Sequence, residues 1–479
     1  MIYDTVIRKG SVVDGSGAAI FTADIALANG RIQRIAEPGT ITDTAREIIE
    51  AEGLYLAPGF IDVHTHDDLE VIHNPQVPAK ISQGVTTVIV GNCGISASPV
   101  TLQSDPPDPL NLLGDRNRFA YPQFSDYARA VQKSSPNVNV AALVGHTSLR
   151  NNHMDDLQRT ATESELTAMR AQLRGALQQG AIGLSSGLAY GSAKCADTAE
   201  VLEMVAELAE QGGVYTTHLR TEFDRILEAM DEALMTAREH RVPLIVSHLK
   251  CAGRGNWGRS EEVLGTLEAA TEYQQVACDC YPYTASSSTL DLAQVTDDVA
   301  VFITWSEPFP EQGGRSLAEI AREWNLSNFE AAEKLMPAGA VYHCMSDEDV
   351  KNILKHPLTM VGSDGLPNDP HPHPRLWGAF PRVLAHYGRD LGLFDLPQAV
   401  HKMSGLSATN FGLANRGFIR EGYCADLVLF DYAALESMAS YAQPQRPAQG
   451  ISRVWVNGVC AYSGGVVHDS RSGAFLFRD

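Results

Sequence analysis

The sequence predicts an α/β protein, namely a TIM-like (β/α)8 barrel with a small β-sandwich domain built from both chain ends and a lid insertion. Two observations lead to this prediction. Through the middle of the chain, short apolar runs alternate with amphipathic helical segments, which is the pattern of parallel strands joined by crossover helices. At both chain ends, Val and Ile instead alternate with polar residues between turns, which is typical of short antiparallel strands.

The barrel prediction depends on apolar segments and on the helices between them. Strands are expected at residues 57–64, 86–93, 139–146, 181–188, 213–218, 243–248, 276–283 and 359–364. Helices are expected at residues 162–179, 197–211, 222–240 and 261–274. The first of these helices begins with a capping box, because Thr162 is followed three residues later by Glu165. Strands and helices therefore alternate as a (β/α)8 barrel requires.

The domain boundaries follow from where this alternation starts, stops and is interrupted. Residues 1–57 and 415–479 share the short-strand pattern, so we expect them to form one small β domain around a barrel of residues 58–414. The interval before the last barrel strand is too long for a simple loop, and it contains several Pro and Gly residues. We therefore expect an insertion at about residues 285–345 that lies over the barrel mouth as a lid.

Composition narrows the classes of function. A chain of 479 residues suits a large enzyme domain plus a smaller one. The formal charge of −21 disfavours nucleic acid and acidic membrane surfaces as partners, so a small-molecule substrate is expected. The N-terminus does not resemble a signal peptide, and no apolar run reaches the about 18 to 20 residues of a membrane helix. We expect a cytoplasmic protein whose eight sparse cysteines are mostly reduced.

Metal-binding residue types stand at the ends of the predicted strands. His64 and His66 follow the first strand at i, i+2 spacing, which directs both imidazoles to one face. Four further residues end later apolar segments: Cys93, His218, His248 and Asp364. In a TIM-like barrel, the C-terminal ends of all strands meet at one rim, where catalytic groups lie. The sequence therefore predicts a metal centre at this rim.

Each of these residues also has a simpler interpretation. A single histidine at a strand end is more often a hydrogen-bonded core residue than a ligand, and a thiol such as Cys93 is often ordinary packing. The joint pattern outweighs these alternatives. Imidazole, thiolate and carboxylate together suit Zn²⁺ better than Mg²⁺ or Ca²⁺, because a thiolate is a soft ligand. From its residues alone, the chain is interpreted as a zinc-dependent hydrolase.

Longer motifs add a specific resemblance. They are Pro58-Gly-Phe-Ile-Asp-Val-His-Thr-His-Asp-Asp68, Ser82-Gln-Gly-Val-Thr-Thr87, Gly91-Asn-Cys-Gly-Ile-Ser96, Thr217-His-Leu-Arg220, Ser247-His-Leu-Lys250, Tyr281-Pro-Tyr283, Gly362-Ser-Asp-Gly-Leu-Pro367 and His373-Pro-Arg-Leu-Trp-Gly378. With these motifs the chain, from about residue 1 to about residue 460, resembles the N-acyl-D-amino-acid deacylases (D-aminoacylases) of the amidohydrolase superfamily. The Gly-Asn-Cys-Gly, Gly-Ser-Asp-Gly and His-Pro-Arg-Leu-Trp-Gly segments are far more specific than the histidine pair.

The resemblance implies roles for the metal-binding residue types. It implies one tight zinc site at Cys93, His218 and His248, and a second, weaker site at His64 and His66 that Cys93 bridges. Many other members of the superfamily bridge two metals with a carboxylated lysine on the fourth strand, but residues 181–187 contain no lysine. The cysteine is interpreted as the substitute bridge. Asp364 would be the general base and then the general acid in hydrolysis of a linear N-acyl-D-amino acid.

The substrate's carboxylate needs local cations in so acidic a protein. Lys250, two residues beyond His248, and Arg375 are the candidates, and the resemblance implies that they act with Tyr281 as a carboxylate clamp. A structural salt bridge for Lys250 and core packing for Tyr281 are the alternatives. The further substrate-binding candidates are Tyr190, Ser287 and Met345, with Leu188, Ala189 and Leu290 as pocket walls, although such residues more often pack in the core.

The charge of the insertion predicts a side-chain preference. Relatives specific for N-acyl-D-glutamate are expected to carry a cation in the lid segment, but residues 281–314 contain no Lys or Arg. They contain Asp291, Asp297 and Asp298 instead. The sequence therefore favours neutral, apolar D-amino acids. Selectivity for the D-enantiomer is implied by the resemblance alone.

Three other functions compete with this interpretation. A cyclic amidase, similar to hydantoinase or dihydroorotase, would share the barrel and the histidines but would need the missing lysine on the fourth strand. A nucleobase deaminase would give Cys93, Lys250 and Arg375 no obvious task. A catalytically inactive barrel used as an assembly scaffold would not need every ligand type together with Asp364.

Overall fold

The structure, a computed structural model, describes residues 2–478 and contains the predicted barrel. Its strand order is β17-β12-β11-β10-β9-β8-β7-β6, and the neighbouring strands pair in parallel. The strands are β6 (Phe60–Asp62), β7 (Val85–Val90), β8 (Asn139–Gly145), β9 (Gly183–Gly187), β10 (Val214–His218), β11 (Leu244–Val246), β12 (Val276–Cys280) and β17 (Thr359–Val361). A parallel bridge between Thr65 and Gly365 joins the first strand region to the last, so the barrel closes beside the predicted metal centre.

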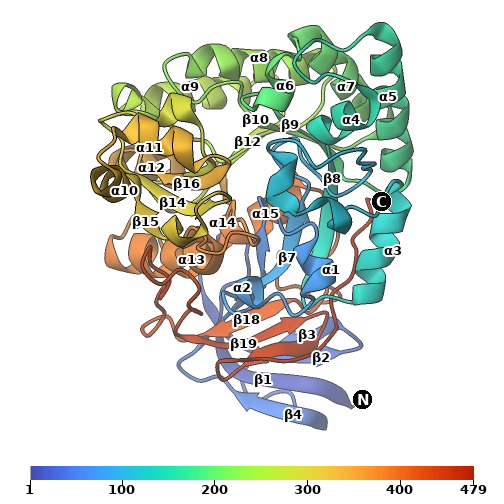
Figure 1. Ribbon diagram of the computed structural model, residues 1–479. Helices are drawn as coiled ribbons and strands as arrows, with labels where there is room; N and C mark the ends of the chain where they lie inside the picture. Colours follow the sequence, from blue (N-terminus) through green and yellow to red (C-terminus); the bar gives the residue numbers. More distant parts are fainter. Residues whose placement is uncertain (1, 479) are drawn as a thin grey trace.

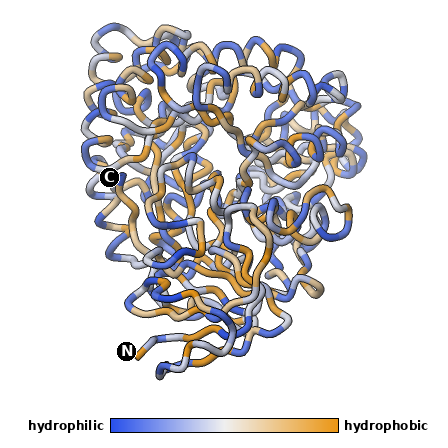
Figure 2. Tube along the Cα trace, turned by 180° about the vertical axis from the view of Figure 1, so that it is seen from behind, coloured by the Kyte–Doolittle hydropathy of each residue, from blue (hydrophilic) through white to orange (hydrophobic). Residues whose placement is uncertain are grey.

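Helices cover the outside of the barrel (Figure 1). They include α3 (Phe124–Ser134), α4 (His146–His153), α5 (Glu163–Gln178), α7 (Thr198–Gln211), α8 (Ile226–Glu239), α9 (Ser260–Ala270), α12 (Asp347–Lys355), α13 (Arg375–Arg382) and α14 (Leu396–Met403). The capping box predicted for α5 is present, because the Thr162 side chain accepts from the Glu165 amide and Glu165 accepts from the Thr162 amide. Hydrophobic residues line the central strands, and the outer helix turns are hydrophilic (Figure 2).

The barrel interior is formed by alternate residues of the strands. Side chains on one face of the strands form a hydrophobic cluster, and α15 (Gly405–Asn410) packs against it through Ala408. The members contributed by the barrel segments are Ile61, Val63, Ile89, Ala141, Leu143, Ile182, Val214, Ile245, Ala277 and Met360. Residues on the opposite face, such as Val88, Val140 and Leu184, belong to the larger core beneath the helices. This two-sided burial explains why the strands read as continuous apolar runs.

Both chain ends meet in one nine-stranded sheet next to the barrel. Its strands are β1 (Tyr3–Val12), β2 (Phe21–Ala28), β3 (Arg31–Ala36), β4 (Ala45–Glu50), β5 (Tyr55–Pro58), β18 (Leu427–Phe430), β19 (Ile451–Val456), β20 (Val459–Ser463) and β21 (Val466–Val467). The two ends join where β5 and β18 pair antiparallel. The blue and red strands lie together at the bottom of Figure 1.

Two differences between the predicted and the observed elements bear on the site. The strand expected at residues 57–64 is two strands, because β5 pairs with the terminal sheet and β6 with the barrel. Gly59 separates them at a site where an added Cβ would lie 2.2 Å from Thr86. The helix expected from residue 222 begins at Ile226. The Glu222 carbonyl instead accepts from Ala252 N and Asn256 Nδ2, each at 2.9 Å, which keeps this loop out of the helix.

The predicted insertion lies between β12 and β17 and has a sheet of its own. Its elements are β13 (Ser286–Thr289), β14 (Val301–Ser306), β15 (Arg315–Ser316), α10 (Leu317–Trp324), α11 (Asn328–Leu335) and β16 (Ala338–Tyr342). The sheet is antiparallel, in the order β13-β16-β14-β15. It lies to one side of the barrel, across from α4 and α5 (Figure 1). No helix within residues 2–478 is long and apolar enough to span a membrane.

Candidate metal centre and substrate site

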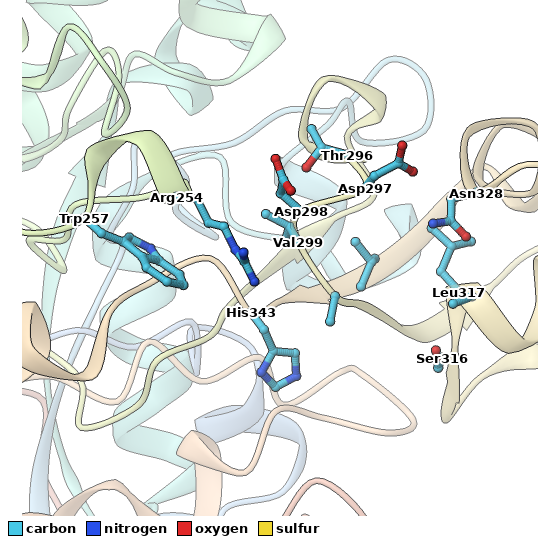
Figure 3. A pocket seen from close by; sticks show the side chains of 13 residues that line it. Arg254, Trp257, Thr296, Asp297, Asp298, Val299, Ser316, Leu317, Asn328 and His343 are labelled. Carbon is cyan, nitrogen blue, oxygen red and sulfur yellow. The ribbon is translucent and has the colours of Figure 1, made fainter.

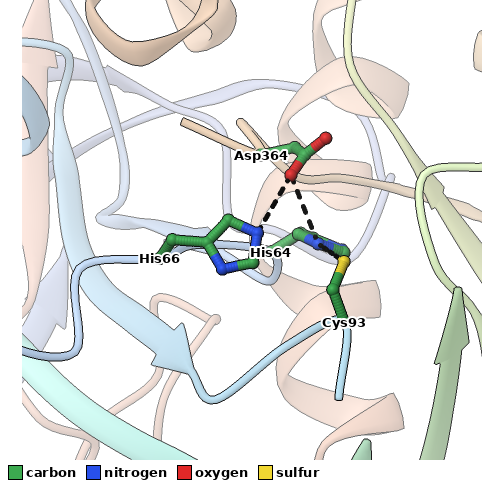
Figure 4. Close-up of side chains that lie close together, drawn as sticks. All are labelled: His64, His66, Cys93 and Asp364. Carbon is green, nitrogen blue, oxygen red and sulfur yellow. Dashed lines mark hydrogen bonds and ion pairs between the residues drawn. The ribbon is translucent and has the colours of Figure 1, made fainter. Parts of the chain in front are cut away.

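The structure brings the predicted metal-binding residue types together at the C-terminal ends of the barrel strands. One group comprises His64, His66, Cys93 and Asp364, and a second comprises Cys93, His218 and His248. Within each group the ligand-type atoms lie within 4.8 Å of one another, and Cys93 belongs to both. The first group is drawn in Figure 4. A thiolate in this shared position is suited to bridge two metal ions.

Three of these residues have an unusual backbone conformation. Cys93, His248 and Asp364 have positive φ angles of 54°, 35° and 48°. Positive φ is uncommon for residues other than glycine and is concentrated at functional sites. The three residues follow β7, β11 and β17, where the chain leaves the strand ladder. The strands predicted to end at residues 93, 248 and 364 therefore end slightly earlier in the structure, at Val90, Val246 and Val361.

Close contacts connect the two groups through Cys93. The Cys93 Sγ atom lies 3.1 Å from His64 Nε2 and 3.3 Å from His248 Nε2. Burial alone would raise the pKa of the Cys93 thiol, but the charges of His64 and His248 hold that pKa well below its ordinary value. The site therefore favours the thiolate, which is the form of cysteine that binds metals.

Asp364 lies between the histidines and a buried cation. Its Oδ1 atom is 3.2 Å from His66 Nε2 and 3.5 Å from His64 Nε2 (Figure 4). Its Oδ2 atom is 2.8 Å from Arg375 Nη1. Burial would raise the pKa of the Asp364 carboxyl, but Arg375 and His64 hold that pKa well below its usual range. The loop after β17 is fixed against the first strand region, because Asp364 N donates to His64 O at 2.8 Å.

Two buried carboxylates that the sequence analysis missed support the histidines. Asp279 Oδ2 is 3.3 Å from His64 Nδ1, and Asp279 Oδ1 accepts from His248 N at 3.0 Å. Glu222 Oε1 is 3.0 Å from His248 Nδ1. Asp279 gave a usable signal in the sequence, because an acidic residue between Cys278 and Cys280 in a buried strand needs a partner inside the barrel. Glu222 gave no such signal, since it lies in a loop.

Lys80 anchors the two segments that carry His64 and Asp364, and the sequence analysis missed it too. The Lys80 ammonium is buried and lies 2.8 Å from Asp62 Oδ2, 2.8 Å from Ser363 Oγ and 3.1 Å from Asp67 Oδ2. Asp62 Oδ1 in turn accepts from Ser363 N at 2.8 Å. This network joins the loop after β6 to the loop after β17.

The predicted clamp residues also lie together. The Arg375 guanidinium stands 4.5 Å from the centre of the Tyr281 ring, and Lys250 Nζ stands 5.8 Å from it. Arg375 Nη2 donates to Ser287 O at 3.1 Å. The Tyr281 hydroxyl, Ser287 Oγ and Arg375 Nε are buried without a hydrogen-bond partner in the described part of the chain. Buried polar atoms normally have partners, so this set is suited to receive an oxygen-rich ligand.

The other predicted pocket residues differ in their surroundings. The Tyr190 ring lies 4.8 Å from the His218 ring, measured between centres. Leu188, Leu290 and Met345 are buried in the main hydrophobic core, and Ala189 is exposed. Lys250 forms an ion pair with Glu222 at 2.5 Å, which is the salt bridge that the sequence analysis held open as its alternative.

A separate pocket of about 450 Å³ lies between the insertion and the loop after β11 (Figure 3). Asp297 and Asp298 line it from the insertion, and Arg254 and Trp257 line it from the loop. Residues 281–314 of the insertion itself contain no Lys or Arg. In the folded chain, Arg254 reaches the same pocket from a different segment and points into it.

The donor set fits zinc. His66 Nδ1 and His218 Nδ1 are buried without hydrogen-bond partners among residues 2–478, and both belong to the metal-type groups. A buried, unpaired imidazole nitrogen beside a thiolate is unfavourable unless a cation completes the site. Sulfur, nitrogen and oxygen donors together match the ligands that zinc accepts. A barrel with such a centre at its C-terminal rim defines a metal-dependent hydrolase of the α/β-barrel class.

Comparison with known sequences identifies the family. The sequence model that describes the amidohydrolase family matches residues 47–462. The chain belongs to this family, within its group of N-acyl-D-amino-acid deacylases. The resemblance found from the motifs is thereby confirmed.

The similarity extends over the whole chain. The chain is 44% identical to the D-aminoacylase of Alcaligenes xylosoxydans xylosoxydans, over 99% of this chain and 98% of that protein. It is also 44% identical to the N-acyl-D-aspartate deacylase of the same organism, over 99% of this chain and 95% of that protein. The solved N-acyl-D-glutamate deacylase of Bordetella bronchiseptica, complexed with zinc and a phosphonate inhibitor, has a TM-score of 0.96 at 42% identity, covering 100% of each chain.

Proposed function

We propose that this protein hydrolyses the amide bond of N-acyl-D-amino acids, with zinc, to give a carboxylate and a free D-amino acid. The position of Asp364 is the observation that carries the proposal. Its carboxylate lies between His64 and His66 of the candidate metal centre on one side and Arg375 on the other. One proton-transfer group thus stands next to a metal centre and next to a cation suited to a substrate carboxylate. The deacylases among the relatives support the same reaction.

Cys93, His218 and His248 would hold the first zinc ion, and His64 and His66 would hold a second, weaker one with Cys93. When bound, zinc supplies a Lewis acid that polarises the amide carbonyl and makes water more acidic. The zinc complex of the Bordetella relative supports this choice of metal. The thiolate favoured at Cys93 supports it as well, because soft sulfur ligands select zinc over magnesium.

Asp364 would carry the proton through the reaction. The nearby Arg375 favours the ionised carboxylate, so Asp364 begins as a base. It accepts a proton from the attacking water while the water oxygen bonds to the acyl carbon. Asp364 then gives this proton to the amide nitrogen as the carbon–nitrogen bond breaks, because an amine leaves far more readily than an amide anion. The products are the carboxylic acid and the free amino group.

Arg375, Lys250 and Tyr281 would hold the substrate's α-carboxylate. The unpartnered Tyr281 hydroxyl and Arg375 Nε atom offer donors that no described protein group satisfies. Ser287 Oγ offers another, and Tyr190 would contact the substrate beside His218. Met345 would contribute to the apolar wall. Local donors of this kind are required because the whole chain carries a formal charge of −21.

We also propose that the preferred D-amino acids have neutral, apolar side chains. The acidic residues and the lack of Lys or Arg in residues 281–314 support this preference. Arg254 opposes it, because it supplies a cation to the pocket beside the insertion. The D-aminoacylase and the N-acyl-D-aspartate deacylase are equally similar to this chain, at 44% identity. The side-chain preference therefore requires a direct assay.

The domain organisation suits the same function. Residues 58–414 would form the catalytic barrel, residues 1–57 and 415–479 a supporting β domain, and residues 285–345 a lid over the substrate. The four-stranded sheet of the insertion supports this division, because it gives the lid a rigid frame. The eight free cysteines are compatible with a cytoplasmic enzyme.

Amine release tests the proposal directly. The substrates are N-acetyl-D-methionine, N-acetyl-L-methionine and N-acetyl-D-glutamate, each with and without added zinc. We expect zinc-dependent release from N-acetyl-D-methionine alone. Faster release from N-acetyl-D-glutamate would overturn the side-chain preference but not the reaction. Turnover of a hydantoin with no release from the three linear amides would overturn the reaction itself.

A further inference from the structure

Glu222 occupies a central position among the groups around His248. It lies in the loop between β10 and α8 and is buried. Its Oε1 atom is 3.0 Å from His248 Nδ1, and its Oε2 atom is 3.9 Å from His218 Nε2. Each carboxylate oxygen thus faces a different histidine of the group formed with Cys93.

The geometry restricts where the His248 ring proton can lie. His248 Nε2 faces Cys93 Sγ at 3.3 Å, so this nitrogen is directed toward the metal-type group. A neutral imidazole that ligates through Nε2 carries its proton on Nδ1 and must donate it. Lys250 Nζ is 2.8 Å from Nδ1, but an ammonium has no lone pair to accept with. Glu222 Oε1, 3.0 Å from Nδ1, is therefore the group placed to accept this proton when His248 holds a metal.

His218 has the complementary arrangement. Its Nδ1 atom is buried and has no hydrogen-bond partner among residues 2–478, whereas its Nε2 atom faces Glu222. The nitrogen left for a metal is Nδ1 in His218 and Nε2 in His248. The Glu222 carboxylate thus lies within hydrogen-bond distance of Nδ1 in His248 and, at 3.9 Å, places negative charge beside Nε2 in His218.

Glu222 also anchors a substrate-clamp residue. The Lys250 ammonium lies 2.5 Å from Oε1, and both side chains are buried. The ammonium favours the ionised carboxylate, which in turn accepts better from His248. The loop holds Glu222 in place, because its carbonyl accepts from Ala252 N and Asn256 Nδ2.

We propose that Glu222 is a positioning residue that sets the ring proton of His248, supplies negative charge beside His218 and places Lys250. Through this one carboxylate, the metal centre and the carboxylate clamp share a single support. The inference rests on the zinc site of the proposed function. It adds a residue whose removal affects metal binding without removing any metal ligand.

Zinc affinity in Glu222→Gln tests this proposal, measured by competition with a chelator. The amide keeps the size of the side chain but is a weaker acceptor and neutral. We expect zinc to bind about 10- to 100-fold more weakly, the usual effect of losing a partner that orients a metal-bound histidine. We also expect an altered visible spectrum of the cobalt-substituted protein, since the ring proton of His248 is no longer fixed.

Two matched variants separate this role from a general structural one. Glu232→Gln changes another partly buried carboxylate, which accepts from Arg220 Nε at 2.8 Å on the adjacent helix α8. We expect its zinc affinity to equal that of the native protein. Lys250→Met removes the lysine but leaves Glu222, so we expect a raised KM and a loss of zinc affinity smaller than that of Glu222→Gln.

The outcomes distinguish the two proposals. Zinc affinity within threefold of native in Glu222→Gln, with an unchanged cobalt spectrum, would overturn the role of Glu222. If the native protein itself bound no zinc, the proposed function would fail first. If Glu222→Gln does not fold, Glu222→Asp is used instead. Its shorter side chain keeps the charge but no longer reaches His248, so we expect zinc to bind at least fivefold more weakly. Unchanged zinc affinity would overturn the role.

Discussion

The Asp364 carboxylate and the Arg375 guanidinium form a buried ion pair, with Oδ2 2.8 Å from Nη1. Asp364 lies in the loop after β17, and Arg375 begins α13. The other carboxylate oxygen faces His64 and His66. This pair therefore couples the metal centre to the carboxylate clamp, and a substrate bound at Arg375 lies next to the group that moves the proton.

Asp364→Asn is expected to lower kcat by about 10²- to 10⁴-fold, the usual contribution of a general acid–base group. Asparagine keeps the shape of the side chain but cannot accept the proton. Steady-state amine release with N-acetyl-D-methionine measures the effect, and zinc content shows that the first metal site persists. The exposed Asp291→Asn serves as the control. A variant that retained a tenth of native kcat would rule out this role.

Cys93→Ala is expected to lose zinc from both sites, because Cys93 is the member shared by the two metal-type groups. His66→Asn is expected to lose only the weaker ion, since His66 belongs to one group. Metal analysis of each purified variant measures the stoichiometry. Equal zinc content in Cys93→Ala and the native protein would show that the thiolate is not a ligand.

Lys80→Met is expected to lower the free energy of unfolding by about 3–5 kcal/mol, because it leaves buried carboxylates without their cation. Lys80 lies 2.8 Å from Asp62 and 3.1 Å from Asp67. Urea denaturation measures the loss. Lys9→Met is the control, since the Lys9–Glu52 pair is exposed and such pairs contribute about 0–1 kcal/mol. Equal stability of the two variants would show that the buried network contributes little.

Asp369→Asn is expected to change the pH dependence of stability. Burial raises the pKa of Asp369 from its ordinary value of 3.8 to about 7. Between pH 4 and pH 7 the unfolded chain has lost this proton and the folded chain retains it, so the contribution of Asp369 to stability falls as pH rises. The total fall is on the order of a few kcal/mol. Above pH 7 the contribution is constant.

Urea denaturation at pH 5 and pH 7.5 tests this expectation. The native protein should lose stability relative to Asp369→Asn over that interval, because asparagine does not titrate. Asp297→Asn, an exposed change in the insertion, should follow the native protein. Parallel behaviour of all three proteins would mean that Asp369 is ionised in the folded state throughout.

The barrel could be predicted from the sequence because its buried strands and their ends recur at regular intervals along the chain. Buried parallel strands appear as apolar runs, and residues such as His64 and Cys93 stand where those runs stop. The exact ends of the strands and helices were predicted less well. The run at residues 57–64 looks like one strand, but Gly59 lets the chain pass from the terminal sheet into the barrel.

The sequence by itself determined the fold class, the family and the residue types of the metal centre, because each is recognised from residues that are close together along the chain. Only the tertiary structure decided which groups face one another across the barrel. It placed Asp279 between His64 and His248, Glu222 beside His248, and Arg254 in the pocket of the insertion. Closure of the barrel makes distant segments neighbours, and such contacts have no periodic signature in the sequence.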